Sequence, residues 1–127
     1  MGKLVGGASE PAITLLPDHK TLLAVFRVEQ HTNFWQATSV DGGRHWSAPQ
    51  QTNAWSVFPQ LRTLANGATV LAAGRPGLGL WLLADGGART ARWDFINLAA
   101  AHNTACAAAG GCTVPGILNQ TALAFHR

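Results

Sequence analysis

Charged side chains are scarce in this sequence, and tyrosine is missing from it altogether. Only 12% of the 127 residues are Asp, Glu, Lys or Arg, whereas 47% are apolar. A chain this apolar can bury a core, so we expect an ordered domain rather than a disordered segment. The nine Lys and Arg give a formal charge of +3, but they are scattered from Lys3 to Arg127 and form no basic stripe. We therefore expect no nucleic-acid partner.

Long apolar segments, targeting signals and metal-ligand clusters are missing as well. No segment reaches transmembrane length without a charge or a breaker, and residues 1–11 lack the apolar run of a signal peptide. We expect no membrane association and no cofactor, while the compartment stays undetermined. The two cysteines, Cys106 and Cys112, have no second Cys or His pair at zinc spacing, so we expect no metal. A small disulfide loop and two free thiols fit the stretch CAAAGGC equally well.

The sequence repeats itself at an interval of 48 residues. PAITLLPDHKTLLAVFR (11–27) aligns with PQLRTLANGATVLAAGR (59–75), so that Arg27 matches Arg75. TALAFHR (121–127) repeats the ending of these segments a third time. Internal repeats of this length indicate an array of similar structural units. We therefore divide a single domain, residues 1–127, into units at 10–54 and 55–103 and an incomplete unit at 104–127.

Each unit has the pattern of short β-strands joined by tight turns. The dipeptides Asp18-His19 and Asn66-Gly67, which align in the repeat, have the chemistry of hairpin turns. LAAAH within FINLAAAHN (95–103) is too short for a convincing helix. Repeats of roughly 40 to 50 residues with about four strands each are typical of β-propeller blades. The apolar segments that predict strands are 12–16, 21–27, 34–39, 60–64, 69–73 and 78–83.

The stretch SVDGGRHW (39–46) has the composition of a structural hairpin. Asp41 can accept hydrogen bonds from backbone N–H groups that the turn leaves unpaired. Gly42 and Gly43 permit a positive φ without steric cost. Ser39 is expected to end the incoming strand, and Trp46 to begin the outgoing one and pack its indole over the turn. Because all these roles are structural, we expect no catalysis at Asp41.

The pattern Ser-x-Asp-x-Gly-x-x-Trp in this stretch resembles the Asp-box, the hairpin motif of sialidases and other Asp-box (BNR-repeat) propellers. ADGGARTARW in the second unit resembles a degenerate copy that keeps Asp85, Gly87 and Trp93. The segments around both boxes are also similar to sialidase-like sequences, so that the resemblance covers most of residues 8–103. It implies an all-β fold, namely the later part of a six-bladed propeller with about two and a half blades of four-stranded antiparallel sheet.

The resemblance implies a glycosidase that releases terminal sialic acid from glycans. Sialidases bind the sugar carboxylate with three arginines, because guanidinium groups match a carboxylate bidentately. They attack with a Tyr that a Glu activates. Carried over to this sequence, Glu10 matches the activating Glu, while Arg27 and Arg75 match two carboxylate-binding arginines. The alternative is a solvated Glu before a Pro and two surface arginines at strand ends. The implied partner is a sialylated or other acidic glycan.

Parts of the family's catalytic machinery have no counterpart in the sequence. There is no Tyr, and the region in which the family's nucleophile is expected carries Cys112 instead. The early blades would supply another arginine and the acid/base Asp. We therefore expect this chain to be a fragment of a sialidase-like hydrolase that is inactive in isolation. Two or three blades would expose apolar faces and unpaired edges, so self-association is an alternative to the fragment.

Two other function classes fit the same sequence. A non-catalytic Asp-box propeller could bind glycans or proteins, and a decayed reading frame would have no function of its own. Trp35 and Trp55 could stack on sugar rings, although core packing is the favoured role for both. Trp81, in an apolar strand, is expected in the core.

Overall fold

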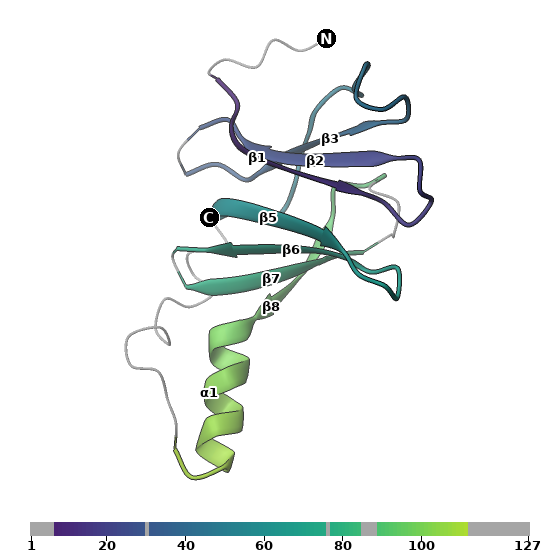
Figure 1. Cartoon of the computed structure of the whole chain (residues 1–127). Helices are drawn as coiled ribbons and strands as arrows, with labels where there is room; N and C mark the ends of the chain where they lie inside the picture. Colours follow the sequence, from purple (N-terminus) through teal and green to yellow (C-terminus); the bar gives the residue numbers. More distant parts are fainter. Residues whose placement is uncertain (1–6, 30, 76, 85–88, 112–127) are drawn as a thin grey trace.

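The chain forms two four-stranded antiparallel sheets and one helix (Figure 1). The computed structural model describes residues 7–29, 31–75, 77–84 and 89–111. The first sheet has the strand order β1-β2-β3-β4 and the second the order β5-β6-β7-β8, so each strand pairs with its neighbour in sequence. The predicted all-β class is thus confirmed at the level of the sheets. The elements are β1 Ser9–Leu15, β2 Leu22–Arg27, β3 Trp35–Ser39, β4 Gln50–Gln51, β5 Val57–Thr63, β6 Thr69–Gly74, β7 Leu78–Leu83, β8 Trp93–Asn97 and α1 Leu98–Ala108.

All six strands expected from the apolar segments are present, and β4 and β8 complete the two sheets. The predicted turns join β1 to β2 and β5 to β6. In the first turn, the Asp18 carboxylate accepts the backbone N–H groups of Lys20 and Thr21 at 2.9 and 2.8 Å. In the second, Gly67 has a φ of 85° and donates its N–H to the carbonyl of Leu64 at 2.9 Å. Turn chemistry and strand patterning therefore agree in both units.

The helix α1 contradicts the expectation of no more than a helical turn at residues 95–103. It runs for 11 residues and crosses the boundary that we had expected between the second and third units. Asn97 caps it by accepting the N–H of Ala100 at 2.9 Å, and its alanines have the highest helix propensity. Cys106 is buried on it, and α1 contacts β7 and β8. The repeated ending at 121–127 lies outside the described residues.

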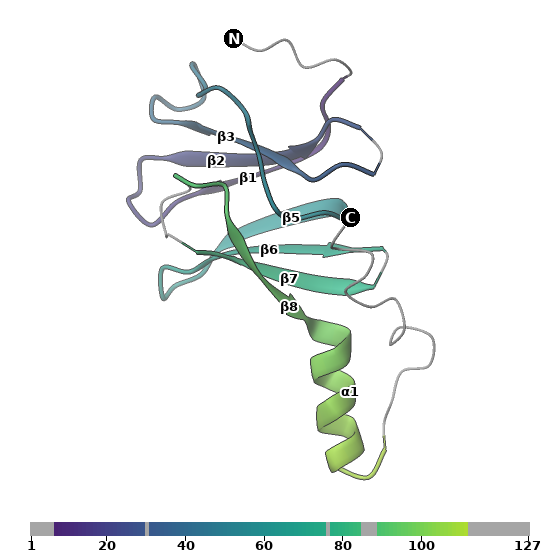
Figure 2. The ribbon, with the colours of Figure 1, turned by 180° about the vertical axis from the view of Figure 1, so that it is seen from behind.

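The hydrophobic core lies between the two sheets, which stack one above the other in both views (Figures 1 and 2). Leu23 and Val25 of β2 are fully buried on the side of the first sheet that faces the second. Leu71 of β6 and Trp81 of β7 meet them from the second sheet. Trp81 therefore occupies the core position that the sequence predicts.

The sheets contact each other through their first strands, β1 and β5, at the repeat interval. The Thr63 hydroxyl donates to the carbonyl of Leu15 at 2.6 Å, and the N–H of Phe58 donates to Glu10 Oε2 at 2.9 Å. Each of these pairs is 48 residues apart in sequence. The strand registers also shift at matching places, once in β1 and once in β5. Equivalent positions of the two units therefore lie side by side.

Amide side chains tie β8 to the first sheet and to the linker before β5. The Trp93 indole N–H donates to Gln36 Oε1 of β3 at 3.0 Å. The side chain of Asn53 accepts the backbone N–H of Trp93 at 2.7 Å and donates to its carbonyl at 2.8 Å. Trp93 and Gln36 are both buried. Hydrogen bonds as well as apolar contacts therefore fix how the sheets stack.

Candidate functional site

The hairpin at 39–46 is held by hydrogen bonds between side chains and backbone. Ser39 ends β3, donates its hydroxyl to Asp41 Oδ1 and accepts the N–H of Gly43, both at 2.9 Å. Asp41 Oδ1 also accepts the N–H of His45 at 2.9 Å. The Trp46 indole donates to the carbonyl of Gly43 at 3.0 Å. These contacts give Asp41 the structural role expected for it.

The electrostatics and backbone of this hairpin agree with that role. Hydrogen bonds from the His45 backbone and imidazole hold the pKa of Asp41 below its ordinary value of 3.8. Gly42 and Gly43 have φ values of 74° and 88°, which favour glycine. One detail differs from expectation, because Trp46 does not begin a strand: β4 starts only at Gln50. The Trp46 indole instead donates a hydrogen bond within the turn, and residues 47–49 separate Trp46 from β4.

The corresponding turn of the second unit falls largely outside the described residues. Asp85 and Gly87, assigned to the degenerate Asp-box, both lie there. Trp93, the third residue of that motif, is described and is 1% exposed. Its indole N–H bonds Gln36 in the first sheet. The contact is one that sequence reasoning missed, because nothing in the motif indicates a partner in the other unit.

Glu10 and Arg27 come together where β1 begins and β2 ends. The strand register pairs Ser9 with Arg27 and shifts between Ser9 and Ala12, the interval in which Glu10 lies. Arg27 Nη1 lies 2.9 Å from both Oε1 and Oε2 of Glu10. The Arg27 and Glu10 side chains are 15% and 23% exposed, so water reaches the ion pair only in part.

The second sheet contributes a third contact to the Glu10 carboxylate, from the N–H of Phe58 at 2.9 Å. That hydrogen bond and the one from Arg27 hold the pKa of Glu10 below its ordinary value of 4.5. The positive charge of Arg75 lowers the same pKa further, which places Arg75 within electrostatic range of Glu10. Glu10 is therefore ionised at neutral pH and is already hydrogen-bonded, which suits an orienting group better than a proton donor.

Arg75 differs from Arg27 in having no side-chain partner among the described residues. Among the described residues, no hydrogen-bonding or ion-pairing partner holds the Arg75 side chain, which is exposed. Its backbone is fixed instead: its N–H donates to the carbonyl of Gly77 at 2.9 Å, and its carbonyl accepts the Ser56 hydroxyl at 3.3 Å. No described residue therefore competes with an anion for the Arg75 guanidinium.

Three residues of this site adopt a left-handed backbone that L side chains rarely take. The φ values are 49° at Glu10, 52° at Phe58 and 69° at Arg75. Such conformations cost about 1–3 kcal/mol each and concentrate at functional sites. Sequence reasoning selected Glu10, Arg27 and Arg75 but missed Phe58. The repeat could have indicated Phe58, because this residue lies 48 residues after Glu10, at the matching position of the second unit.

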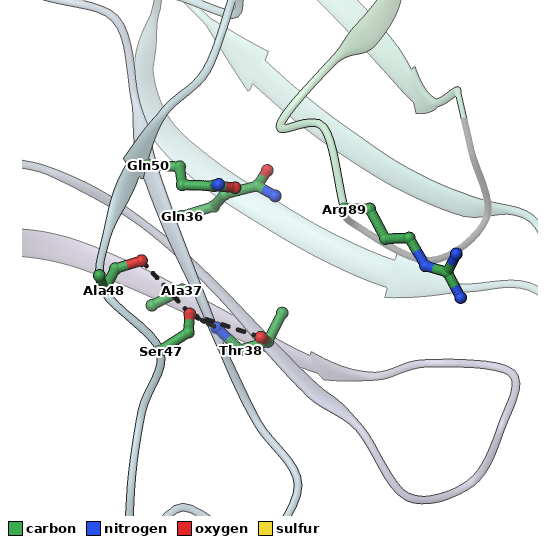
Figure 3. Close-up of a pocket in the computed structure, with 7 residues that line it drawn as sticks. All are labelled: Gln36, Ala37, Thr38, Ser47, Ala48, Gln50 and Arg89. Atoms are coloured by element: carbon green, nitrogen blue, oxygen red, sulfur yellow. Dashed lines mark hydrogen bonds between the residues drawn. The ribbon is translucent and has the colours of Figure 1, made fainter.

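A polar hollow of about 340 Å³ lies along β3 (Figure 3). Ser47 Oγ accepts the N–H of Thr38 at 3.0 Å on one side of it, and Arg89 stands on the other side (Figure 3). None of the residues predicted for the site lines this hollow, so sequence reasoning missed it. Its lining residues are Gln36, Ala37, Thr38, Ser47, Ala48, Gln50 and Arg89.

Of the two tryptophans considered for sugar stacking, Trp55 is already engaged. Trp55 packs against the core, and its ring stacks on that of His31 with centroids 6.3 Å apart. Trp35 is half-buried and pairs with Phe26 across β2 and β3. For Trp55, the structure confirms core packing, which is the role that we favour from the sequence.

Neither a metal cluster nor a membrane-spanning helix is found in the part of the chain that the structure describes. No three His, Cys, Asp or Glu side chains of that part come together to hold an ion. Its helix is too short to cross a bilayer. Cys106 Sγ lies 3.2 Å from His102 Nε2, while Cys112, the other cysteine of the stretch for which a disulfide and free thiols were both left open, lies outside the described residues.

No protein-family model matches the sequence, and no curated protein matches it either.

Proposed function

We propose that this chain is the carboxylate-recognition part of a sialidase-like β-propeller and that its ligand is an acidic sugar of the sialic-acid type. The observation that carries the proposal is the Glu10–Arg27 ion pair, together with the exposed side chain of Arg75, whose positive charge lowers the pKa of Glu10. The two arginines align in the sequence repeat, although the strand registers pair Ser9 with Arg27 and its counterpart Val57 with Gly74, so that Arg75 lies one residue beyond the matching position. Two meander sheets stacked through their first strands fit adjacent propeller blades, and first strands line the channel at which propellers bind ligands.

The proposed roles follow from the contacts of each side chain. Arg75 supplies a guanidinium fork for the sugar carboxylate, and Arg27 supplies the donors that Glu10 does not occupy. Glu10, ionised and bonded to the N–H of Phe58, orients Arg27 toward the ligand. In a sialidase the equivalent Glu would activate a Tyr, and this chain contains none. We therefore propose a parent hydrolase whose catalytic groups are incomplete in this chain.

Binding is tested by NMR titration of the ¹⁵N-labelled chain with sialic acid and with its methyl ester, which lacks the charge. We expect shifts at the Phe58 amide with the acid and much weaker ones with the ester. Arg75→Ala should weaken binding about tenfold or more, because a charge-assisted hydrogen bond contributes about 1.5–3 kcal/mol. Arg62→Ala, an exposed arginine of β5, is the matched control. Equal losses in both variants would contradict the proposal.

Hydrolysis is tested separately with a fluorogenic sialoside. We expect no turnover above the buffer rate, because the chain has no Tyr to serve as nucleophile. Turnover that Arg75→Ala abolishes would contradict the proposed inactivity and require a different nucleophile.

A non-catalytic glycan-binding module is the second candidate function, and the hollow along β3 favours it. Amides, hydroxyls and one guanidinium line a volume of about 340 Å³, and such groups bind sugar hydroxyls without needing a carboxylate. The same titration with a neutral monosaccharide separates the two functions. Shifts at Thr38 and Ser47 rather than at Phe58 would favour the module.

A further inference from the structure

Strand pairing fixes the backbone of Arg27 but does not reach that of Arg75. In the first sheet, the β1–β2 ladder still includes Arg27, which is paired with Ser9. In the second sheet, the β5–β6 ladder ends at the pair of Val57 and Gly74. Arg75 comes one residue later, so another contact must decide where its side chain lies.

The backbone conformation of Arg75 is one that needs such a contact. Its φ of 69° lies in the left-handed region, which residues other than glycine rarely adopt. Pro76 follows it in the sequence, and a residue before proline is biased toward extended conformations. The bond from the Arg75 N–H to the carbonyl of Gly77, at 2.9 Å, comes from only two residues away. It therefore ties the segment to itself and not to the sheet.

The hydroxyl of Ser56 provides the contact to the sheet. It donates to the carbonyl of Arg75 at 3.3 Å, and Ser56 is 1% exposed, so water does not compete for this bond. Ser56 comes directly before β5 and would lie opposite Arg75 if the β5–β6 ladder continued by one pair. The side chain thus does for Arg75 what strand pairing does for Arg27. Ala8, the matching residue of the first unit, has no hydroxyl.

We propose that Ser56 is a positioning residue for Arg75, whose backbone it holds in the left-handed conformation that sets where the guanidinium lies. Ser56 acts through Arg75 and does not contact the ligand itself. Its effect on anion binding rests on the proposed function, whereas its effect on Arg75 does not. Removal of the Ser56 hydroxyl should therefore matter only while Arg75 is present.

The backbone of Arg75 tests this role without any ligand. The amide and α protons of a left-handed residue lie close together and give a strong NOE. We expect such an NOE at Arg75 in the wild type and a clearly weaker one in Ser56→Ala, because the released backbone returns to an extended conformation. Thr52→Val is the matched control, since it removes another buried hydroxyl between β4 and β5, and it should keep the NOE. Equal NOEs in wild type and Ser56→Ala would overturn the proposal.

The carboxyl group of Glu10 reports where the charge of Arg75 lies. The charges of Arg27 and Arg75 both lower the pKa of Glu10, so displacing Arg75 should raise this pKa toward its ordinary value of 4.5. We expect Ser56→Ala and Arg75→Ala each to raise it, as measured by NMR titration of the Glu10 carboxyl carbon. The double variant should raise it no further than Arg75→Ala alone. An unchanged pKa in Ser56→Ala, or a further rise in the double variant, would overturn the positioning role.

The affinity for sialic acid extends the test to the proposed ligand. Ser56→Ala should weaken binding about fivefold, the effect of about one neutral hydrogen bond, and should have no effect in the Arg75→Ala background. An equal loss in Thr52→Val would overturn the positioning role. If the wild type did not bind sialic acid, the proposed function would fail, while the NOE of Arg75 and the pKa of Glu10 would still decide the role of Ser56.

Discussion

At the residue scale, Glu10 is stabilised by partners outside its own strand. Its carboxylate is bonded by Arg27 of β2 and by the N–H of Phe58 in β5. Its backbone holds a φ of 49°, a conformation that persists only where surrounding contacts determine it. The residue thus connects three strands and both sheets.

Glu10→Gln should remove a pH-dependent part of the stability. The folded-state pKa of Glu10 is lowered from 4.5, so its contribution is complete above pH 4.5 and is lost as the pH falls through the lower folded value. We expect the variant to lose about 1 kcal/mol at pH 7, a value reduced for partial exposure. Urea unfolding at pH 7 and pH 3 measures it. If wild type and Glu10→Gln differed in free energy of unfolding by the same amount at both pH values, the interpretation would be contradicted. A similar loss in the control Glu29→Gln would contradict it as well.

Asp41→Ala should loosen the 39–46 hairpin without affecting ligand binding. The carboxylate holds the His45 N–H and the Ser39 hydroxyl, and the variant leaves both without that acceptor. We expect the thermal midpoint to fall by a few degrees and amide exchange at Gly43 and His45 to accelerate. Asp94→Ala, an exposed carboxylate of β8, is the control and should change neither. A loss of sialic-acid binding would contradict the structural role.

At the element scale, the sequence indicated the place of α1 correctly but predicted too short a helix. LAAAH on its own does not nucleate a helix, but NTACAA continues it to Ala108. Asn97 provides the first cap, and Ala99, Asn103 and Cys106 form its buried side. The helix therefore depends on an N-cap residue and on packing contacts that lie partly outside the five residues LAAAH.

Asn97→Ala should shorten or fray α1. Replacing an N-cap residue by Ala typically costs about 1 kcal/mol, and here it removes the acceptor for the N–H of Ala100. Circular dichroism at 222 nm and thermal unfolding measure the loss. The control is Thr104→Ala on an exposed position of the same helix, where Ala has the higher propensity. Unchanged helicity in Asn97→Ala would show that packing alone holds the helix.

At the scale of the whole molecule, the stacking of the sheets depends on polar contacts as well as on the core. Gln36 and Trp93 are 57 residues apart in sequence and both are buried. A buried polar group that loses its partner pays a desolvation penalty, whereas removing both partners is better tolerated.

Gln36→Leu should cost about 1–3 kcal/mol, because it leaves the Trp93 indole N–H without its acceptor. Combining it with Trp93→Phe should cost less than the sum of the two single variants. A double-mutant cycle by urea unfolding measures the coupling. Strict additivity would mean that the hydrogen bond does not couple the sheets.

The sequence predicts the parts of this molecule that depend on local chemistry. Strand segments and turns at Asp18 and Asn66 are confirmed, because turn residues and apolar runs act over a few positions. Glu10, Arg27 and Arg75 were selected from a family resemblance, and the pairing of the first two follows from the β1–β2 register. The bonds from Phe58 and Gln36 were missed, because register shifts and contacts between sheets leave no local pattern.

The meander order of both sheets has a consequence for how the chain folds. Every strand pairs with its sequence neighbour, whereas the contacts between sheets join residues 48 or more apart. Closing short loops is faster than closing long ones, so we expect hairpins to form before the sheets stack. Trp46, bonded within its own turn, would then change its fluorescence early. Trp93, which needs both sheets, would change late, so the two indoles separate the stages of folding in time.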